Sequence, residues 1–203
     1  MIKKITFLLL IASTAQAGNE YVLPTGYSFG LHPRNDIQEL IELKSNNGID
    51  SIKYVTMAPG VSEDDVEIWL TSCSRRMVKG IPETLCEVIK DNFLISVSGQ
   101  KTYPYLIYFD NKTMNSLANS KNPNFKLIER ETNYKIDASS TITLPMIGLS
   151  GNYNSNVLVR EAKKGNILYY SIKNNEKYQS YKLNLTGFKE SMDFAEAFIS
   201  ANK

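Results

Sequence analysis

The sequence has few of the side chains that most often perform catalysis or bind metals. Its 203 residues include one histidine, His32, and two cysteines, Cys73 and Cys86. Zinc generally takes three or four His, Cys or carboxylate ligands, and acid–base and nucleophilic catalysis most often use a histidine. The chain also has no G-x-S-x-G motif and no glycine-rich phosphate loop. We therefore expect no metal, no cofactor and no Ser-His-Asp hydrolase.

The chain also lacks an excess of one charge. Lys and Arg total 23, and Asp and Glu total 21. Residues 1–17, which we expect to be removed, contain Lys3 and Lys4 and no acidic residue, so the remaining chain has 23 − 2 = 21 basic and 21 acidic residues. A neutral chain without basic runs gives little reason to expect nucleic acid or an anionic membrane as partner.

Residues 1–17 have the pattern of a secretory signal peptide. A short basic start is followed by an apolar run over residues 5–12 and by small residues at Ala15 and Ala17. Signals of this type end in A-x-A, which predicts cleavage after Ala17. The alternative is a transmembrane anchor, but that needs about 20 apolar residues, and no later segment has them either. We therefore expect a bacterial protein that is periplasmic or secreted, without an integral membrane segment.

The two cysteines agree with export. An even number of cysteines in a chain bound for an oxidising compartment favours a disulfide between Cys73 and Cys86. Such a bridge should stabilise the fold by about 3 kcal/mol in the chain-entropy model. Two buried free thiols are the alternative. A redox pair is less favoured because it needs C-x-x-C at the start of a helix.

Apolar residues with a period of two predict strands over most of the chain. The expected strands cover residues 51–57, 66–73, 86–98, 103–109, 126–136 and 141–144. A hairpin is expected from residues 167–173 and 178–185 around an Asn-Asn-Glu-Lys turn. A short helix should start at Asn154 or Ser155 and end at Gly165 in a left-handed cap.

Two further helices are expected near the ends of the chain. Apolar residues at three- and four-residue spacing predict a short helix over residues 36–45 and a final helix from Phe188 onward. The fold class is therefore mainly β (α+β). An antiparallel β-sandwich-like domain with a C-terminal helix should occupy residues 61–203, after an N-terminal extension with a short helix at residues 18–60.

Other candidate sites are weak. His32 lies in a turn-rich segment, where a surface or capping role is favoured over a catalytic one. The one acidic cluster is Glu63, Asp64, Asp65 and Glu67. It lacks the spaced ligands of a dedicated calcium loop, so a solvated turn is favoured. The pair Asp64 and Glu67 is compatible with glycoside hydrolysis, but such a pair alone does not distinguish a glycoside hydrolase from other proteins.

The twelve tyrosines are the best candidates for a binding surface. The two main groups are Tyr103, Tyr105 and Tyr108, and Tyr169, Tyr170, Tyr178 and Tyr181. Tyrosine offers contact area and a hydrogen-bonding tip at low entropic cost. We take Tyr103, Tyr105 and Tyr108 as the candidate surface. The alternative is that these rings only fill half-buried strand positions.

Several short motifs occur in an order that resembles a known family. Trp69 and Cys73 form a W-x-x-x-C motif, Cys86 follows, and a hydrophobic-Asp step ends at Asp137. A helix then ends in Lys-Gly, and Gly187 is followed by Phe before the final helix. Over about residues 66–200 this layout resembles the invasion-associated locus B family of exported bacterial proteins. The family commonly has a second Cys pair where this chain reads residues 146–153, and residues 18–60 are unmatched.

The resemblance implies an exported, mainly β protein associated with host-cell invasion or envelope functions. It supplies no catalytic residues. Our leading hypothesis is a non-enzymatic binding or interaction protein whose partner is a protein or an envelope component. The alternatives are an exported hydrolase that uses carboxylates, and an envelope assembly subunit that uses exposed strand edges.

Overall fold

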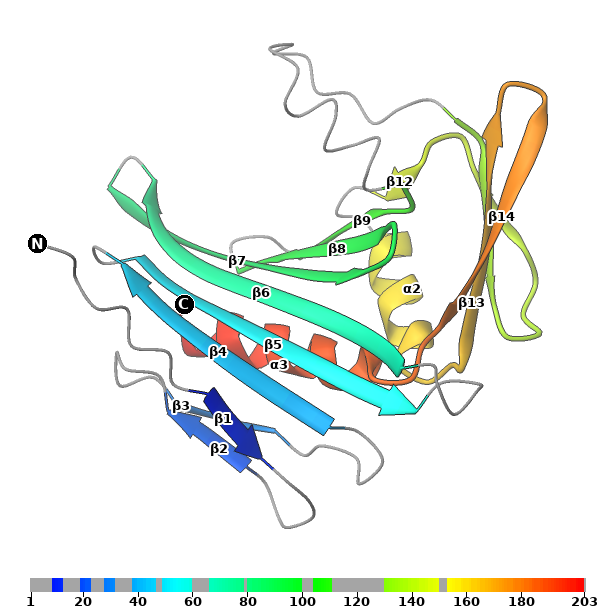
Figure 1. The fold of residues 1–203 in the computed structure, drawn as a ribbon. Helices are drawn as coiled ribbons and strands as arrows, with labels where there is room; N and C mark the ends of the chain where they lie inside the picture. The colour runs from blue at the N-terminus through cyan, green and yellow to red at the C-terminus, as the bar shows by residue number, and fades with distance from the viewer. Residues whose placement is uncertain are drawn as a thin grey trace, which may run out of the picture.

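The computed structural model describes most of the chain after residue 37 and three short segments before it. The described residues are 9–12, 19–22, 28–31, 38–46, 49–59, 66–78, 80–99, 104–110, 130–149 and 153–202. They form two main antiparallel sheets that share one core with the two helices of this part of the chain (Figure 1).

The larger sheet has eight strands, and each strand is antiparallel to its neighbours. Its spatial order is β1 (Leu9–Ala12), β4 (Gln38–Asn46), β5 (Ile49–Pro59), β6 (Val66–Val78), β7 (Ile81–Lys90), β8 (Phe93–Ser98), β9 (Tyr105–Tyr108) and β12 (Gly148–Leu149). The period-two pattern is visible in β6, where Trp69, Thr71 and Cys73 are buried while the residues between them are partly exposed. One face of the larger sheet is therefore the core face.

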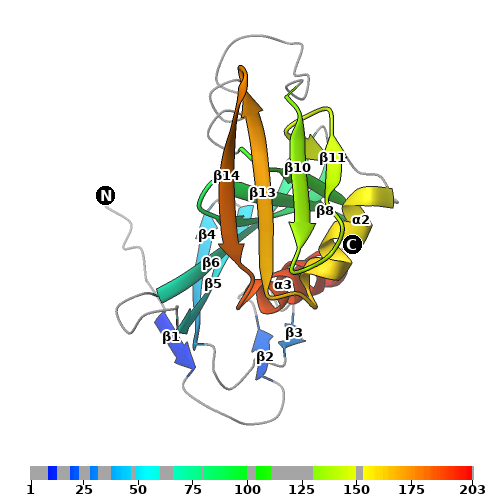
Figure 2. The same cartoon turned by 90° about the vertical axis from the view of Figure 1, so that its right-hand side faces the viewer.

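The smaller sheet has four strands and closes one end of the core. Its order is β11 (Ile142–Leu144), β10 (Thr132–Ile136), β13 (Ile167–Asn174) and β14 (Lys177–Asn184). Figure 2 looks onto this sheet, with strands of the larger sheet behind it. A separate pair is formed by β2 (Asn19–Val22) and β3 (Ser28–Leu31). In the smaller sheet, β13 pairs with β14 along its full length, which confirms the predicted hairpin.

Helix α3 (Phe188–Ala201) covers the core face of the larger sheet, and α2 (Tyr153–Ala162) contacts β9. The ring of Phe194 stacks on that of Tyr54 with centroids 4.2 Å apart. Phe188 contacts Trp69, whose ring also meets Phe93 edge-on. This aromatic contact links the final helix to β6 and β8, so the C-terminal segment is part of the core.

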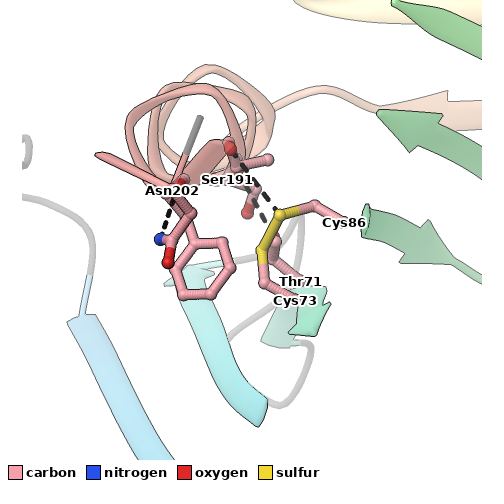
Figure 3. Close-up of a disulfide and its surroundings, with 7 residues drawn as sticks. Thr71, Cys73, Cys86, Ser191 and Asn202 are labelled. Carbon is pink, nitrogen blue, oxygen red and sulfur yellow. Dashed lines mark hydrogen bonds between the residues drawn. A yellow bond between two sulfur atoms is a disulfide. The ribbon is translucent and has the colours of Figure 1, made fainter. Parts of the chain in front are cut away.

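The predicted disulfide is confirmed. Cys73 on β6 and Cys86 on β7 are opposite each other in the strand register and are bonded. Both are fully buried beneath α3 (Figure 3), where the Cys86 Sγ lies 3.6 Å from the Ala195 carbonyl oxygen. Thr71 also reaches the helix through its Oγ1, which donates to the Ser191 carbonyl. The bridge therefore joins two strands directly under the helix that covers them.

The mainly antiparallel β fold with a C-terminal helix is confirmed, but the helix predicted over residues 36–45 is wrong. Those residues belong largely to β4, which pairs along its full length with β5 from Gln38 with Met57 to Asn46 with Ile49. Only Asn47 and Gly48 separate the paired ends. Asn-Gly between two strands is the strongest short hairpin signal in a sequence, so this signal and the pairing with β5 override the helical spacing.

Gly165 also differs from its prediction. It follows α2 as expected, but among the described residues positive φ angles at glycine occur only at Gly80 and Gly187. A Cβ atom at Gly165 would lie 2.4 Å from the Ile136 Cγ2. Glycine is therefore required here by the close approach of β10 and not by a left-handed cap.

Strand β1 lies inside the segment that the sequence predicts to be a leader. Its partner is β4, with Leu10 opposite Ile41. Cleavage after Ala17 would remove β1 and leave β4 as an edge strand. Among the described residues, no helix is both long and apolar enough to cross a membrane.

Candidate functional site

Two members of the first predicted tyrosine group, Tyr105 and Tyr108, do not share one face of the sheet. Tyr103 lies outside the described residues, and Tyr105 and Tyr108 are on β9. Because their positions differ by three, the two side chains lie on opposite faces of the strand. Whether either one binds a partner stays a prediction.

Tyr105 is part of a polar network on the core side. Its hydroxyl donates to Glu196 Oε1 at 2.7 Å, and the same carboxylate accepts from Lys163 Nζ at 2.8 and 2.9 Å. Lys163 also donates to Asp193 at 2.9 Å. Burial, reinforced by Glu196, raises the pKa of Tyr105 above its ordinary value. The network joins β9 to the end of α2 and to α3, which is a structural role.

Tyr108 lies on the other face of β9 and is half-buried. Its register partner on β8 is Leu94. Burial raises the pKa of its hydroxyl, and the Glu87 carboxylate adds to the shift. The ring fills a half-buried strand position in the way the alternative interpretation describes.

The second tyrosine group is divided between the two faces of the smaller sheet. Tyr170 and Tyr181 are opposite each other and stack at 4.8 Å on the core side. Tyr170 also contacts Phe109 at 5.4 Å. Tyr169 and Tyr178 alternate with them and lie on the face that points away from the core. The group therefore supplies both a core contact and a surface.

The register defines that surface, which we call the outer face. One row of cross-strand neighbours on this face is Lys135, Tyr169 and Lys182, and a second row is Asn133, Ser171 and Ser180. Lys173 and Tyr178, which are opposite each other, lie on the same face. Cross-strand neighbours share a face of an antiparallel sheet. The outer face is therefore polar and aromatic, with three lysines.

The aromatic rings on the outer face are held by charged neighbours. The Lys135 Nζ lies 5.4 Å from the centre of the Tyr169 ring, and the Lys173 Nζ lies 5.9 Å from that of Tyr178. Both distances are within cation–π range. The Tyr178 hydroxyl donates to Glu131, and this hydrogen bond raises the pKa of Tyr178. Since Tyr178 is still 47% exposed, its ring is both fixed and accessible.

Sequence reasoning singled out the tyrosines but missed Lys135 and Lys182. The signal was present in the hairpin itself, because the alternation that places Tyr169 opposite residue 182 also fixes which lysine shares its face. Lys135 comes from β10, whose pairing with β13 involves a separation of more than 30 residues in the chain. Local pattern does not give such a pairing.

The carboxylate and histidine candidates do not form a described site. His32 and the segment containing Asp64 lie outside the described residues. Glu67 is held by the buried Lys90, whose Nζ also donates to the Asn184 carbonyl at 3.0 Å. Within the described part of the chain, no group of three or more His, Cys, Asp or Glu residues is placed to hold a metal ion.

Comparison with protein-family models, with curated proteins and with solved structures finds no match to this chain. The geometry above is therefore the basis for a functional assignment.

Proposed function

We propose that this chain is an exported, non-enzymatic bacterial binding protein that contacts a protein or an envelope component through the outer face of its smaller sheet. The observation that carries the proposal is the pair of rings on that face, the partly exposed Tyr169 and the exposed Tyr178, each held beside a lysine. Export rests on the signal pattern that ends at Ala17.

A sheet face that only contacts water does not need tyrosine rings held beside lysines. Antiparallel sheets commonly expose one polar face to water, and lysine, serine and asparagine alone would suffice for it. A tyrosine ring that is already held loses little rotamer freedom when a partner covers it, so less free energy is lost on binding. The cation–π contact at Tyr169 and the Glu131 bond at Tyr178 support this preorganisation.

Two features support a role without catalysis. The chain has a single histidine, and both cysteines are joined in a buried disulfide. A bonded sulfur has no thiolate to act as a nucleophile. We also propose kinship with the invasion-associated locus B family, on the order of the motifs from Trp69 to Phe188.

The test is capture of a partner from bacterial envelope extracts by the purified protein and by two variants. Tyr169→Ser with Lys182→Glu should lose the captured component and keep the melting temperature of the parent protein. The control Tyr153→Ser removes a 68% exposed tyrosine on α2, away from the outer face, and should capture normally. Equal capture by all three proteins would contradict the proposal, as would turnover of a defined compound that depends on one carboxylate.

A further inference from the structure

The end of the β6–β7 hairpin leaves the body of the larger sheet. The β5 strand pairs with β6 only as far as Arg75, and β8 pairs with β7 only as far as Leu85. Beyond these points β6 and β7 pair only with each other, with Met77 opposite Pro82 and Val78 opposite Ile81. We call these two pairs the hairpin tip. Figure 1 shows it on the side of the molecule opposite β13 and β14.

The hairpin tip exposes large apolar side chains on both of its faces. Met77 is 65% exposed and Ile81 is 60% exposed. Met77 shares the face of Cys73, while Ile81 lies on the face opposite that of Cys86, because side chains alternate along each strand. Single exposed apolar residues are ordinary on a surface. Two at the end of one projecting ribbon, on opposite faces, form an apolar wedge.

The sequence around the hairpin tip has an excess of basic residues. Residues 75–84 contain three cations, Arg75, Arg76 and Lys79, and one carboxylate, Glu83, so this stretch carries 3 − 1 = +2. The chain without residues 1–17 is neutral as a whole, so this stretch is more positive than the average of the chain. Apolar side chains beside lysine and arginine are the combination that binds anionic bilayer surfaces.

We propose that the hairpin tip inserts shallowly into a lipid surface that bears anionic headgroups. A lipid surface fits the tip better than a protein does, because a stable protein interface needs about 800 Å² from each partner. The end of a two-stranded ribbon offers a narrow wedge instead of such an area. Lipid surrounds an inserted ribbon on all sides, so the apolar side chains on both faces of the hairpin tip contact the bilayer.

The experiment is cosedimentation of the purified, disulfide-bonded protein with vesicles of phosphatidylcholine alone and with vesicles of phosphatidylcholine and phosphatidylglycerol in equal parts. The parent protein should sediment with the anionic vesicles, and added salt should weaken this binding. Met77→Ser with Ile81→Ser should bind at least about tenfold more weakly, because two apolar groups are lost from the inserted region.

A matched control is available at the other end of the same strand. Val66 and Ile68 are 59% and 48% exposed, and Val66→Ser with Ile68→Ser should bind the anionic vesicles like the parent protein. Equal melting temperatures of all variants show that folding is unchanged. The proposal is wrong if the parent protein does not sediment with anionic vesicles or if the hairpin tip variant binds as strongly as the parent. It is also wrong if the tip variant loses only the capture of an envelope protein, since the tip would then dock a protein.

Discussion

The Oγ1 atom of Thr56 lies only 2.6 Å from the position that a Cβ atom would take at Gly187. Gly187 also has a φ of 85°, in the left-handed region, and it immediately precedes α3. The Thr56 Oγ1 donates a hydrogen bond to the Gly187 carbonyl at 3.3 Å. The turn between β14 and α3 therefore packs directly against β5, and this contact fixes where the final helix starts.

Gly187→Ala should destabilise the protein by more than 2 kcal/mol in urea unfolding. The left-handed conformation alone costs about 1 kcal/mol for a residue with a Cβ, and displacement of the buried Thr56 adds to it. Gly80→Ala is the control, because Gly80 has a φ of 79° with nothing within 4 Å of the added Cβ. It should lose only about 1 kcal/mol. Equal losses at both positions would show that the contact with Thr56 does not matter.

Segments with a strong local pattern were predictable. The hairpin of β13 and β14 and the helix α3 match their predictions to within about two residues, as boundaries from pattern usually do. Their alternation or helical stripe and their turn residues all agree with the final structure.

Segments whose pattern fits two structures were not predictable from spacing alone. Residues 38–46 contain leucine and isoleucine at helical spacing, yet the pairing with β5 makes them a strand. The division of Tyr105 and Tyr108 between two faces was available from their spacing once a strand was assigned. The assembly of the outer face was not, because β10 and β13 are brought together by tertiary structure.

The motifs behind the family resemblance all have structural explanations. Trp69 and Cys73 are fully buried. The Asp137 carboxylate accepts the backbone N–H groups of Asn166 and Ile167, at 2.9 Å for Ile167. Gly165 adjoins β10, as described above. These residues are explained by the packing of this chain, so their presence does not point to a partner.

Loss of the disulfide should destabilise the protein substantially. In Cys73→Ala with Cys86→Ala, we expect a loss of about 3 kcal/mol in the free energy of unfolding, because the unfolded chain is no longer restrained. Urea titration of the oxidised parent protein and of the variant measures this. Alkylation before and after reduction, followed by intact mass, checks that the parent protein is bridged. An unchanged urea midpoint in the variant would contradict the expected role of the bridge.

The buried Lys90 and the partly exposed Glu67 should behave as one unit. Lys90 is 7% exposed and its Nζ lies 5.3 Å from the centre of the Trp69 ring. Glu67→Leu leaves a buried cation without its carboxylate and should cost about 3 kcal/mol. Adding Lys90→Met should recover part of that loss, because no charge is then left unpaired. A double-mutant cycle in urea measures the coupling, and purely additive effects would contradict it.

The network around Lys163 should make stability depend on pH at both ends of the range. Burial opposes ionisation of Asp193, but hydrogen bonds from Lys189 and Lys163 outweigh it and lower its pKa. Burial also opposes the charge on Lys163, but its bonds to Glu196 and Asp193 raise its pKa. The Asp193 contribution is fully present above its unfolded pKa and is lost as pH falls through the lower folded value. The Lys163 contribution is fully present below its unfolded pKa and is lost as pH rises through the higher folded value.

Lys163→Met should therefore be less stable than the parent protein at neutral pH, and the difference should shrink at acidic pH, as Asp193 takes up a proton and loses its charge. Lys164→Met is the control, since Lys164 is the exposed neighbour in the chain and should unfold like the parent at both pH values. Urea midpoints at the two pH values are the measurement. A deficit of the same size at both would show that the lost contact is not ionic.

The most direct test of the account is hydrogen exchange, followed by mass spectrometry, on the protein alone and on the complex captured from envelope extracts. If the outer face is the binding surface, amides in β10, β13 and β14 should gain protection in the complex while those in α2 and β8 stay unchanged. Protection confined to other elements, with residues 167–184 exchanging as in the free protein, would contradict the claim that this face binds the partner.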